Sequence, residues 1–109
     1  MQVRRKERRV KIYIAGKITG EPNYKEKFDI AATSLEAQGH IVLNPAELPE
    51  GMLPADYMRI CYAMLDTAHA VYLLKNWEDS RGATIERNYA AYTGKAVFTE
   101  QEWEDEKPY

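Results

Sequence analysis

One acidic residue, Glu86, follows a run of small and polar residues in a way that suits chemistry on a small molecule. Residues 77–86 read as the end of a strand, a loop and the first turns of a helix. If that helix begins near Ser80, Glu86 lies in its second turn, on a face shared with Gly82 and Ala83. Small residues beside a carboxylate let a ligand approach it. The alternative is a solvated glutamate, as most helix glutamates are.

A second small-residue loop, residues 15–20, closes the first expected strand. Backbone N–H groups between a strand and a helix favour anions, and Lys17 and Thr19 add a positive charge and a hydroxyl. The loop has neither the Walker pattern nor the six-residue dinucleotide fingerprint, so it is either an anion site or only a turn. Its candidate binding residues are Gly16, Lys17, Ile18, Thr19 and Gly20.

Three further residues are candidates for the same site. Tyr13 lies in the first expected strand, where its phenol either reaches a carboxylate or is a core side chain. Asn44 ends the second strand, and His69 begins the third. A histidine at a strand start is usually structural, and with only His40 besides, no metal constellation is visible. We therefore expect no metal and no organic cofactor.

The elements that must position these residues alternate between strands and helices. Strands are expected at 10–16, 40–44, 69–74 and 95–98. Helices follow Pro22, Pro54 and Ser80. Short connections favour parallel strands with right-handed crossovers. We predict an α/β fold: a three-layer, Rossmann-like or flavodoxin-like open parallel sheet of four strands, or five if the C-terminal segment contributes, with flanking helices.

Topology also indicates where a ligand would bind. In open parallel sheets, ligands bind beyond the carboxyl ends of the strands, near the switch in strand order. Gly16, Asn44 and the loop 75–82 all follow expected strands and belong to that edge. The site hypothesis therefore rests on topology as well as on motif.

The composition is that of one globular domain. The chain has 109 residues, of which 45% are hydrophobic and 29% charged, with a net charge of −2. No apolar run approaches the ~20 residues of a membrane span, and no signal-peptide core is visible, so we expect a cytoplasmic protein. The one cysteine, Cys61, excludes an intrachain disulfide and is expected to be buried and structural.

Charge divides the chain into three parts. Residues 1–9 form a basic arm, residues 10–98 the α/β domain and residues 99–109 an acidic tail. The arm either contacts nucleic-acid phosphates or is a solvated lead-in to the first strand. We prefer the second interpretation, because no further basic stripe follows. The exposed edges of so small a sheet and the eight tyrosines favour a homodimer or a higher homo-oligomer.

Three segments together resemble the nucleoside 2-deoxyribosyltransferase superfamily, in particular a compact bacterial and phage branch of it. They are residues 11–20, the pair Asn44 and Pro45, and residues 77–86. The resemblance spans roughly residues 10–98. In that superfamily a helix glutamate attacks the anomeric carbon of a nucleoside or nucleotide and displaces the base. Water or another base then resolves the glycosyl-enzyme.

The resemblance implies a role for several candidate residues. Glu86 matches the nucleophile, and Tyr13 matches the first-strand tyrosine that orients it. The loop 16–20 matches the segment that surrounds the 5′-phosphate in nucleotide-hydrolysing members. Ser80 stands where nucleotide N-glycosidases carry serine, which implies a nucleoside monophosphate as substrate.

His69 departs from the superfamily pattern, in which the third strand usually opens with an aspartate that contacts or protonates the base. A histidine can serve as a general acid near neutral pH, and it equally fits a loss of catalysis. Two functions therefore stay open. One is hydrolysis or transfer at the N-glycosidic bond of a nucleoside monophosphate or nucleoside. The other is non-catalytic binding of a nucleotide or an NAD-derived metabolite.

Overall fold

The sheet of this protein is built from four parallel strands. The computed structural model describes residues 9–105. The strands are β1 (Lys11–Ala15), β2 (Ile41–Leu43), β3 (Ala70–Leu73) and β4 (Ala96–Thr99). Their order in the sheet is β2-β1-β3-β4, and the register pairs Tyr13 with Leu43 on one side and with Val71 on the other. The predicted α/β fold with an all-parallel sheet is confirmed.

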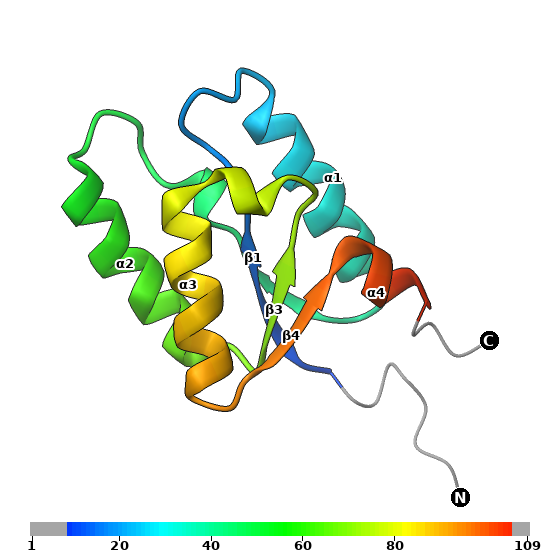
Figure 1. Cartoon of the computed structure of the whole chain (residues 1–109). Helices are drawn as coiled ribbons and strands as arrows, with labels where there is room; N and C mark the ends of the chain where they lie inside the picture. The colour runs from blue at the N-terminus through cyan, green and yellow to red at the C-terminus, as the bar shows by residue number, and fades with distance from the viewer. Residues whose placement is uncertain (1–8, 106–109) are drawn as a thin grey trace, which may run out of the picture.

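Helices cover both faces of the sheet and complete three layers (Figure 1). Helices α2 (Pro54–Thr67) and α3 (Arg81–Tyr92) lie on one face, and α1 (Tyr24–Ala37) and α4 (Glu100–Asp105) lie on the other. Two short 3-10 turns, η2 (Pro45–Glu47) and η3 (Trp77–Asp79), follow β2 and β3. Among residues 9–105, no helix is long and apolar enough to cross a membrane.

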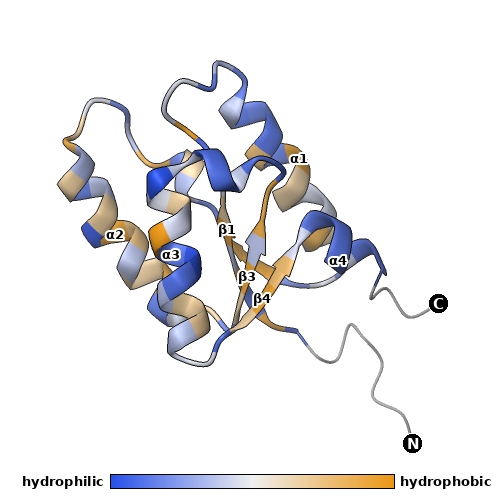
Figure 2. Cartoon of the chain, viewed as in Figure 1, coloured by the Kyte–Doolittle hydropathy of each residue, from blue (hydrophilic) through white to orange (hydrophobic). Residues whose placement is uncertain are grey.

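The alternation of side chains along β1 divides the core into two parts. Ile12 and Ile14 pack with α1, whereas Tyr13 and Ala15 pack with α2 and α3. In Figure 2 the apolar residues gather on the strands, and the start of α1 and the surface of α4 are hydrophilic. Each face of the sheet therefore has its own apolar cluster, and the Tyr13 side chain belongs to the α2 and α3 side.

The segment after β4 is a helix anchored to the core, and it adds no fifth strand among the described residues. The Trp103 ring packs edge-on against Phe98 and Tyr72, with centroid distances of 5.3 and 6.0 Å. Its indole N–H also donates a hydrogen bond of 3.1 Å to Oε1 of Gln38. Residues 100–105 of the expected acidic tail therefore form a helix that packs on the core. Residues 1–8 of the expected basic arm and residues 106–109 lie outside the described residues.

Candidate active site

A cavity opens where the strand order changes direction. Strand β1 lies between β2 and β3. The chain runs from β1 to β2 on one side of β1 and later returns to β3 on the other side of β1. In such sheets the crevice lies beyond the carboxyl ends of these two strands. A cavity of about 970 Å³ is present there, with walls from β1, the following loop 16–19, the segment 45–61 and residues 79–86.

Tyr13 and Glu86 form a buried pair in this cavity. The Tyr13 hydroxyl donates a hydrogen bond of 3.0 Å to Oε2 of Glu86. The Tyr13 side chain is 1% exposed and Glu86 is 6% exposed. Within residues 9–105, Glu86 is the only acidic residue that is buried. The prediction that Glu86 points inward is confirmed, and so is the prediction that the Tyr13 phenol can reach it.

The buried position changes the ionisation of both groups. Burial raises the pKa of Glu86 to about 7, and the hydrogen bond from Tyr13 partly opposes this rise. Burial, followed by the charge of Glu86, raises the pKa of Tyr13 far above its ordinary value. Tyr13 therefore stays protonated as a donor, whereas Glu86 changes its charge near neutral pH. A buried carboxyl group with such a shift is typical of a functional site.

Helix α3 begins at the cavity. The Ser80 side chain caps it, because Oγ of Ser80 accepts a hydrogen bond of 3.1 Å from the Ala83 N–H. The amides of Arg81 and Gly82 come earlier and have no partner within the helix. Together with the partial positive charge of a helix N-terminus, they favour an anion at this end of the cavity.

The three glycines of the predicted site have different physical explanations. A Cβ at Gly16 would lie 2.8 Å from Cδ1 of Leu74, so the close packing of the two loops requires glycine. Gly20 has a φ of +77°, which its turn requires. A Cβ at Gly82 would meet Cε of Met58 at 3.9 Å, an ordinary contact. The fold therefore does not require glycine at position 82, where the missing side chain leaves space beside the buried carboxylate.

Most of the predicted site residues line the cavity. They are Tyr13, Gly16, Lys17, Ile18, Thr19, Ser80, Gly82, Ala83 and Glu86. Gly20 and Asn44 do not line it. Oδ1 of Asn44 accepts a hydrogen bond of 2.9 Å from the Ala46 N–H and so caps η2.

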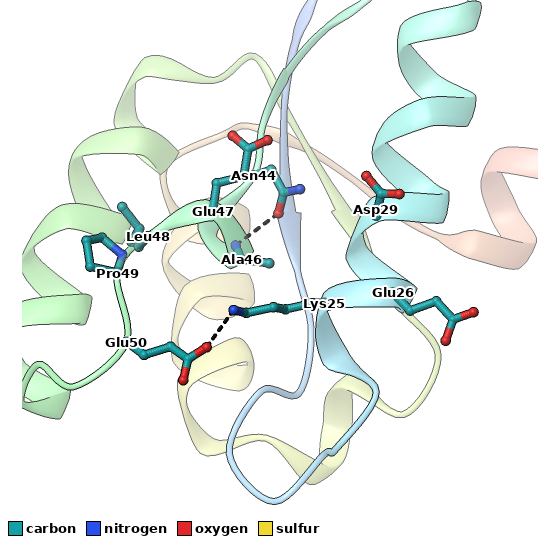
Figure 3. A pocket seen from close by; sticks show the side chains of 9 residues that line it. All are labelled: Lys25, Glu26, Asp29, Asn44, Ala46, Glu47, Leu48, Pro49 and Glu50. Carbon is teal, nitrogen blue, oxygen red and sulfur yellow. Dashed lines mark hydrogen bonds and ion pairs between the residues drawn. The ribbon is translucent and has the colours of Figure 1, made fainter.

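Asn44 lines a neighbouring open groove instead (Figure 3). Most of the ionisable residues along this groove are acidic: Glu26, Asp29, Glu47 and Glu50. Lys25 reaches across from α1, and its Nζ lies 2.5 Å from Oε2 of Glu50. Within the described residues, no group of three or more His, Cys, Asp or Glu side chains is arranged to hold a metal ion.

His69 lies at the opposite edge of the sheet. Its Nδ1 accepts a hydrogen bond of 3.0 Å from the Lys11 N–H, at the amino ends of β1 and β3. The prediction of His69 as a general acid for this site was wrong. A residue that begins a parallel strand lies at the amino edge of the sheet, whereas the cavity opens at the carboxyl edge.

Helix α2 and the loop before it supply a wall that the sequence did not indicate. Met52, Met58 and Cys61 line the cavity from this side. The apolar stripe of α2 predicts core packing, and nothing in its spacing separates a cavity wall from a core face. Asp79 and Arg81 also line the cavity, on either side of the predicted Ser80. The expectation that Cys61 is buried is confirmed.

The chain is a small α/β protein with a cavity at the switch point of an open parallel sheet, and this cavity contains one buried carboxylate. The chain belongs to the family described as Domain of unknown function (DUF4406), which matches residues 10–99. The matched range includes all residues that line the cavity. No curated protein and no solved structure matches the chain.

Proposed function

We propose that this protein cleaves the N-glycosidic bond of a nucleoside monophosphate or nucleoside, with Glu86 as the nucleophile. The observation that carries the proposal is the buried hydrogen bond between Tyr13 and Glu86 in the cavity. Cleavage of an N-glycoside passes through an oxocarbenium-like transition state, which a nearby carboxylate stabilises or traps. Among the described residues, no Lys or Arg forms an ion pair with Glu86. Its negative charge therefore remains available to the sugar.

The proposed reaction has two steps. An oxygen of ionised Glu86 forms a bond to the anomeric carbon while the bond to the base nitrogen breaks, and the base leaves with the electron pair and takes up a proton. Water then attacks the same carbon and loses a proton to solvent, the bond to Glu86 breaks, and the sugar, or the sugar phosphate from a monophosphate, is released. Alternatively, the nitrogen of a second base attacks this carbon and loses its proton, the bond to Glu86 breaks in the same way, and a new N-glycoside forms. Tyr13 orients the carboxylate through its hydrogen bond in both steps.

Several polar groups of the cavity lining support a phosphate on the substrate. The first amides of α3 at Arg81 and Gly82, the Lys17 ammonium and the Thr19 hydroxyl all belong to residues that line it. A phosphate held there supplies binding energy away from the reacting carbon, and this energy orients the sugar over Glu86. We therefore propose nucleoside monophosphates as the preferred substrates.

The test is to incubate the protein with ribo- and deoxyribonucleoside monophosphates and to measure released base by chromatography. Base release by the wild type and none by Glu86→Gln is the expected result. No release from any substrate, or equal release by Glu86→Gln, contradicts the proposal. The Gln variant is a matched control because it keeps the size of the side chain and removes only the charge.

A second candidate function is non-catalytic binding of a nucleotide or an NAD-derived metabolite. It is favoured by the position of His69, which leaves that histidine unable to protonate a leaving base in the cavity. Thermal unfolding together with chromatography of the ligand separates the two functions, because a binder gains stability with ligand and leaves the ligand intact.

The remaining expectations on partners and location belong to the same proposal. We infer a homo-oligomer, since Ile85 and Tyr92 of α3 expose apolar surface and Tyr92 is 92% exposed. Sedimentation that finds only a monomer contradicts this. A cytoplasmic location, where nucleotides are abundant, also remains a proposal, and fractionation of cells tests it.

A further inference from the structure

Within the described part of the chain, one wall of the cavity contains no charged residue. It consists of the lining residues of the segment 45–61: Pro45, Leu48, Met52, Pro54, Ala55, Tyr57, Met58 and Cys61. We call this set the α2 wall, because most of its members belong to α2. The charged residues of the lining come from other segments: Lys17 follows β1, and Asp79, Arg81 and Glu86 lie at or near the start of α3. The α2 wall is therefore suited to the apolar part of a ligand.

The hydroxyl of Tyr57 is engaged by the backbone of the segment before α2. It donates a hydrogen bond of 2.5 Å to the Pro49 carbonyl and accepts one of 3.2 Å from the Met52 N–H. A phenol has one proton, so this hydroxyl has none to donate to a ligand. The two bonds join α2 to both ends of the segment 49–52.

These bonds hold Met52 in the cavity lining. Met52 lines the cavity, whereas its neighbour Leu53 does not and is 68% exposed. The bond to the Met52 N–H fixes the backbone in the position that gives this division. A second contact of the segment, the ion pair between Lys25 and Glu50, joins two exposed side chains, and such pairs contribute little to stability. Among the described contacts, the Tyr57 hydroxyl is therefore the main side-chain anchor of the segment.

We propose that Tyr57 is a positioning residue of this site: its two backbone hydrogen bonds hold Met52 in the α2 wall, against which the flat apolar part of the ligand lies. The identity of that part rests on the proposed function, under which it is the base of a nucleoside monophosphate. Bases gain affinity from contact with aromatic rings. The thioethers of Met52 and Met58 add polarizable surface that adapts to the shape of the base.

The test measures binding to the full chain carrying Glu86→Gln, which removes the proposed nucleophile so that the ligand stays intact. The probes are adenosine monophosphate and cytidine monophosphate, which carry a base, and ribose 5-phosphate, which carries none. NMR titration measures the affinity of each probe. We expect both nucleotides to bind more tightly than ribose 5-phosphate, by about tenfold or more.

Tyr57→Phe keeps the ring and removes the hydroxyl. It should weaken the binding of both nucleotides by about threefold or more, because the hydrogen bonds that hold Met52 are lost. The binding of ribose 5-phosphate should not change. In the chain without ligand, hydrogen exchange at the Met52 amide should become faster, because this amide loses its acceptor.

Tyr89→Phe is the matched control. It also removes a phenol hydroxyl that makes a hydrogen bond, of 2.7 Å to Oδ1 of Asp66, and Tyr89 does not line the cavity. It should change neither the affinity of any probe nor the exchange of the Met52 amide. A loss of stability that both variants share is thereby separated from an effect on the site.

Several results would overturn the proposal. They are an unchanged nucleotide affinity in Tyr57→Phe, an equal loss for ribose 5-phosphate, the same loss in Tyr89→Phe, and unchanged exchange at the Met52 amide. Failure of the proposed function gives a different result. If nucleotides bind in a way that depends on Tyr57 and the wild type releases no base, cleavage is excluded and the role of Tyr57 stands. If the wild type releases base and Tyr57→Phe has the same KM, the role of Tyr57 is excluded and cleavage stands. If no probe binds, both proposals are wrong.

Discussion

The hydroxyl of Tyr13 lies 3.0 Å from Oε2 of Glu86, although 73 positions separate the two residues in the chain. One comes from the central strand β1 and the other from α3, which packs on that face of the sheet. Both side chains are buried, so the loss of either one leaves the other as an unpaired polar group. The properties of this pair lead to several predictions.

Replacing Glu86 with Gln should remove a dependence of stability on pH. The pKa of Glu86 rises from an ordinary 4.5 to about 7 in the folded protein. The folded state then holds this proton more tightly than the unfolded state does, so stability falls as pH rises from about 4.5 through about 7. A shift of this size corresponds to at most about 3 kcal/mol. Gln is neutral throughout and does not lose this stability.

Urea unfolding at pH 5 and at pH 8 measures the effect. We expect the stability of Glu86→Gln relative to the wild type to be greater at pH 8 than at pH 5. The same difference at both pH values would contradict a raised pKa of Glu86.

The rate of base release should depend on the same ionisation. Glu86 attacks as a carboxylate, so the rate should rise with pH up to about 7 and then level off. Tyr13→Phe removes the hydrogen bond that favours the carboxylate, which raises the pKa of Glu86 and moves the rising limb to higher pH. The measurement is a pH–rate profile of both proteins. A rising limb at the same pH in Tyr13→Phe speaks against this coupling.

Two glycines of the site should respond to alanine in opposite ways. Gly16→Ala should destabilise the protein, because its Cβ would lie 2.8 Å from Leu74. Gly82→Ala should keep or raise stability by up to about 1 kcal/mol, since alanine favours a helix, and should weaken nucleotide binding by filling space beside Glu86. Urea unfolding and calorimetric titration test the two effects. If Gly82→Ala binds the nucleotide with wild-type affinity, no ligand occupies the space beside Gly82.

A negative charge introduced at the start of α3 tests whether the phosphate binds there. Ser80→Ala removes the cap on the Ala83 N–H and should cost about 1 kcal/mol. Ser80→Asp keeps a capping oxygen and should keep most of the stability, but its negative charge should repel a phosphate. Calorimetry with a nucleoside monophosphate compares the variants. Wild-type affinity in Ser80→Asp would place the phosphate elsewhere.

Trp103 should be important for stability although it lies in an acidic segment. It packs against Tyr72 and Phe98 and covers one face of the sheet. Trp103→Ala should lower the free energy of unfolding by about 3 kcal/mol. Gln101→Ala, on the exposed side of the same helix, is the control and should stay within about 0.5 kcal/mol. Equal effects of the two changes would mean that α4 does not anchor through Trp103.

Local patterns were sufficient to predict the sheet and the inward position of Glu86. The apolar run of β1 and the Ser80 cap are short-range signals, and small residues one turn before Glu86 mark an approachable face. The roles of Gly16 and Gly82 could not be separated from sequence. Glycine is required at position 16 because of Leu74. This residue is distant in the chain and contacts Gly16 only in the folded protein.

The features that the sequence did not predict correctly also have physical explanations. The imidazole of His69 is suitable for a general acid. However, His69 lies at the amino end of β3, and this places it at the edge of the sheet opposite to the cavity. Most residues of α4 are acidic, so the composition of this segment did not indicate a helix. The helix packs on the core through one side chain, that of Trp103. The cavity wall at Met58 has the same spacing as a core stripe, so its exposure to a ligand depends on how α2 lies across the sheet.

The central place of β1 has a consequence for how the protein is made. Its two neighbours, β2 and β3, both follow it in the chain. A ribosome therefore releases this apolar strand before either neighbour has been synthesised, and Glu86 leaves the exit tunnel later still. During translation β1 therefore has no strand to pair with until β2 and β3 have left the exit tunnel, and its apolar side chains stay exposed for that time.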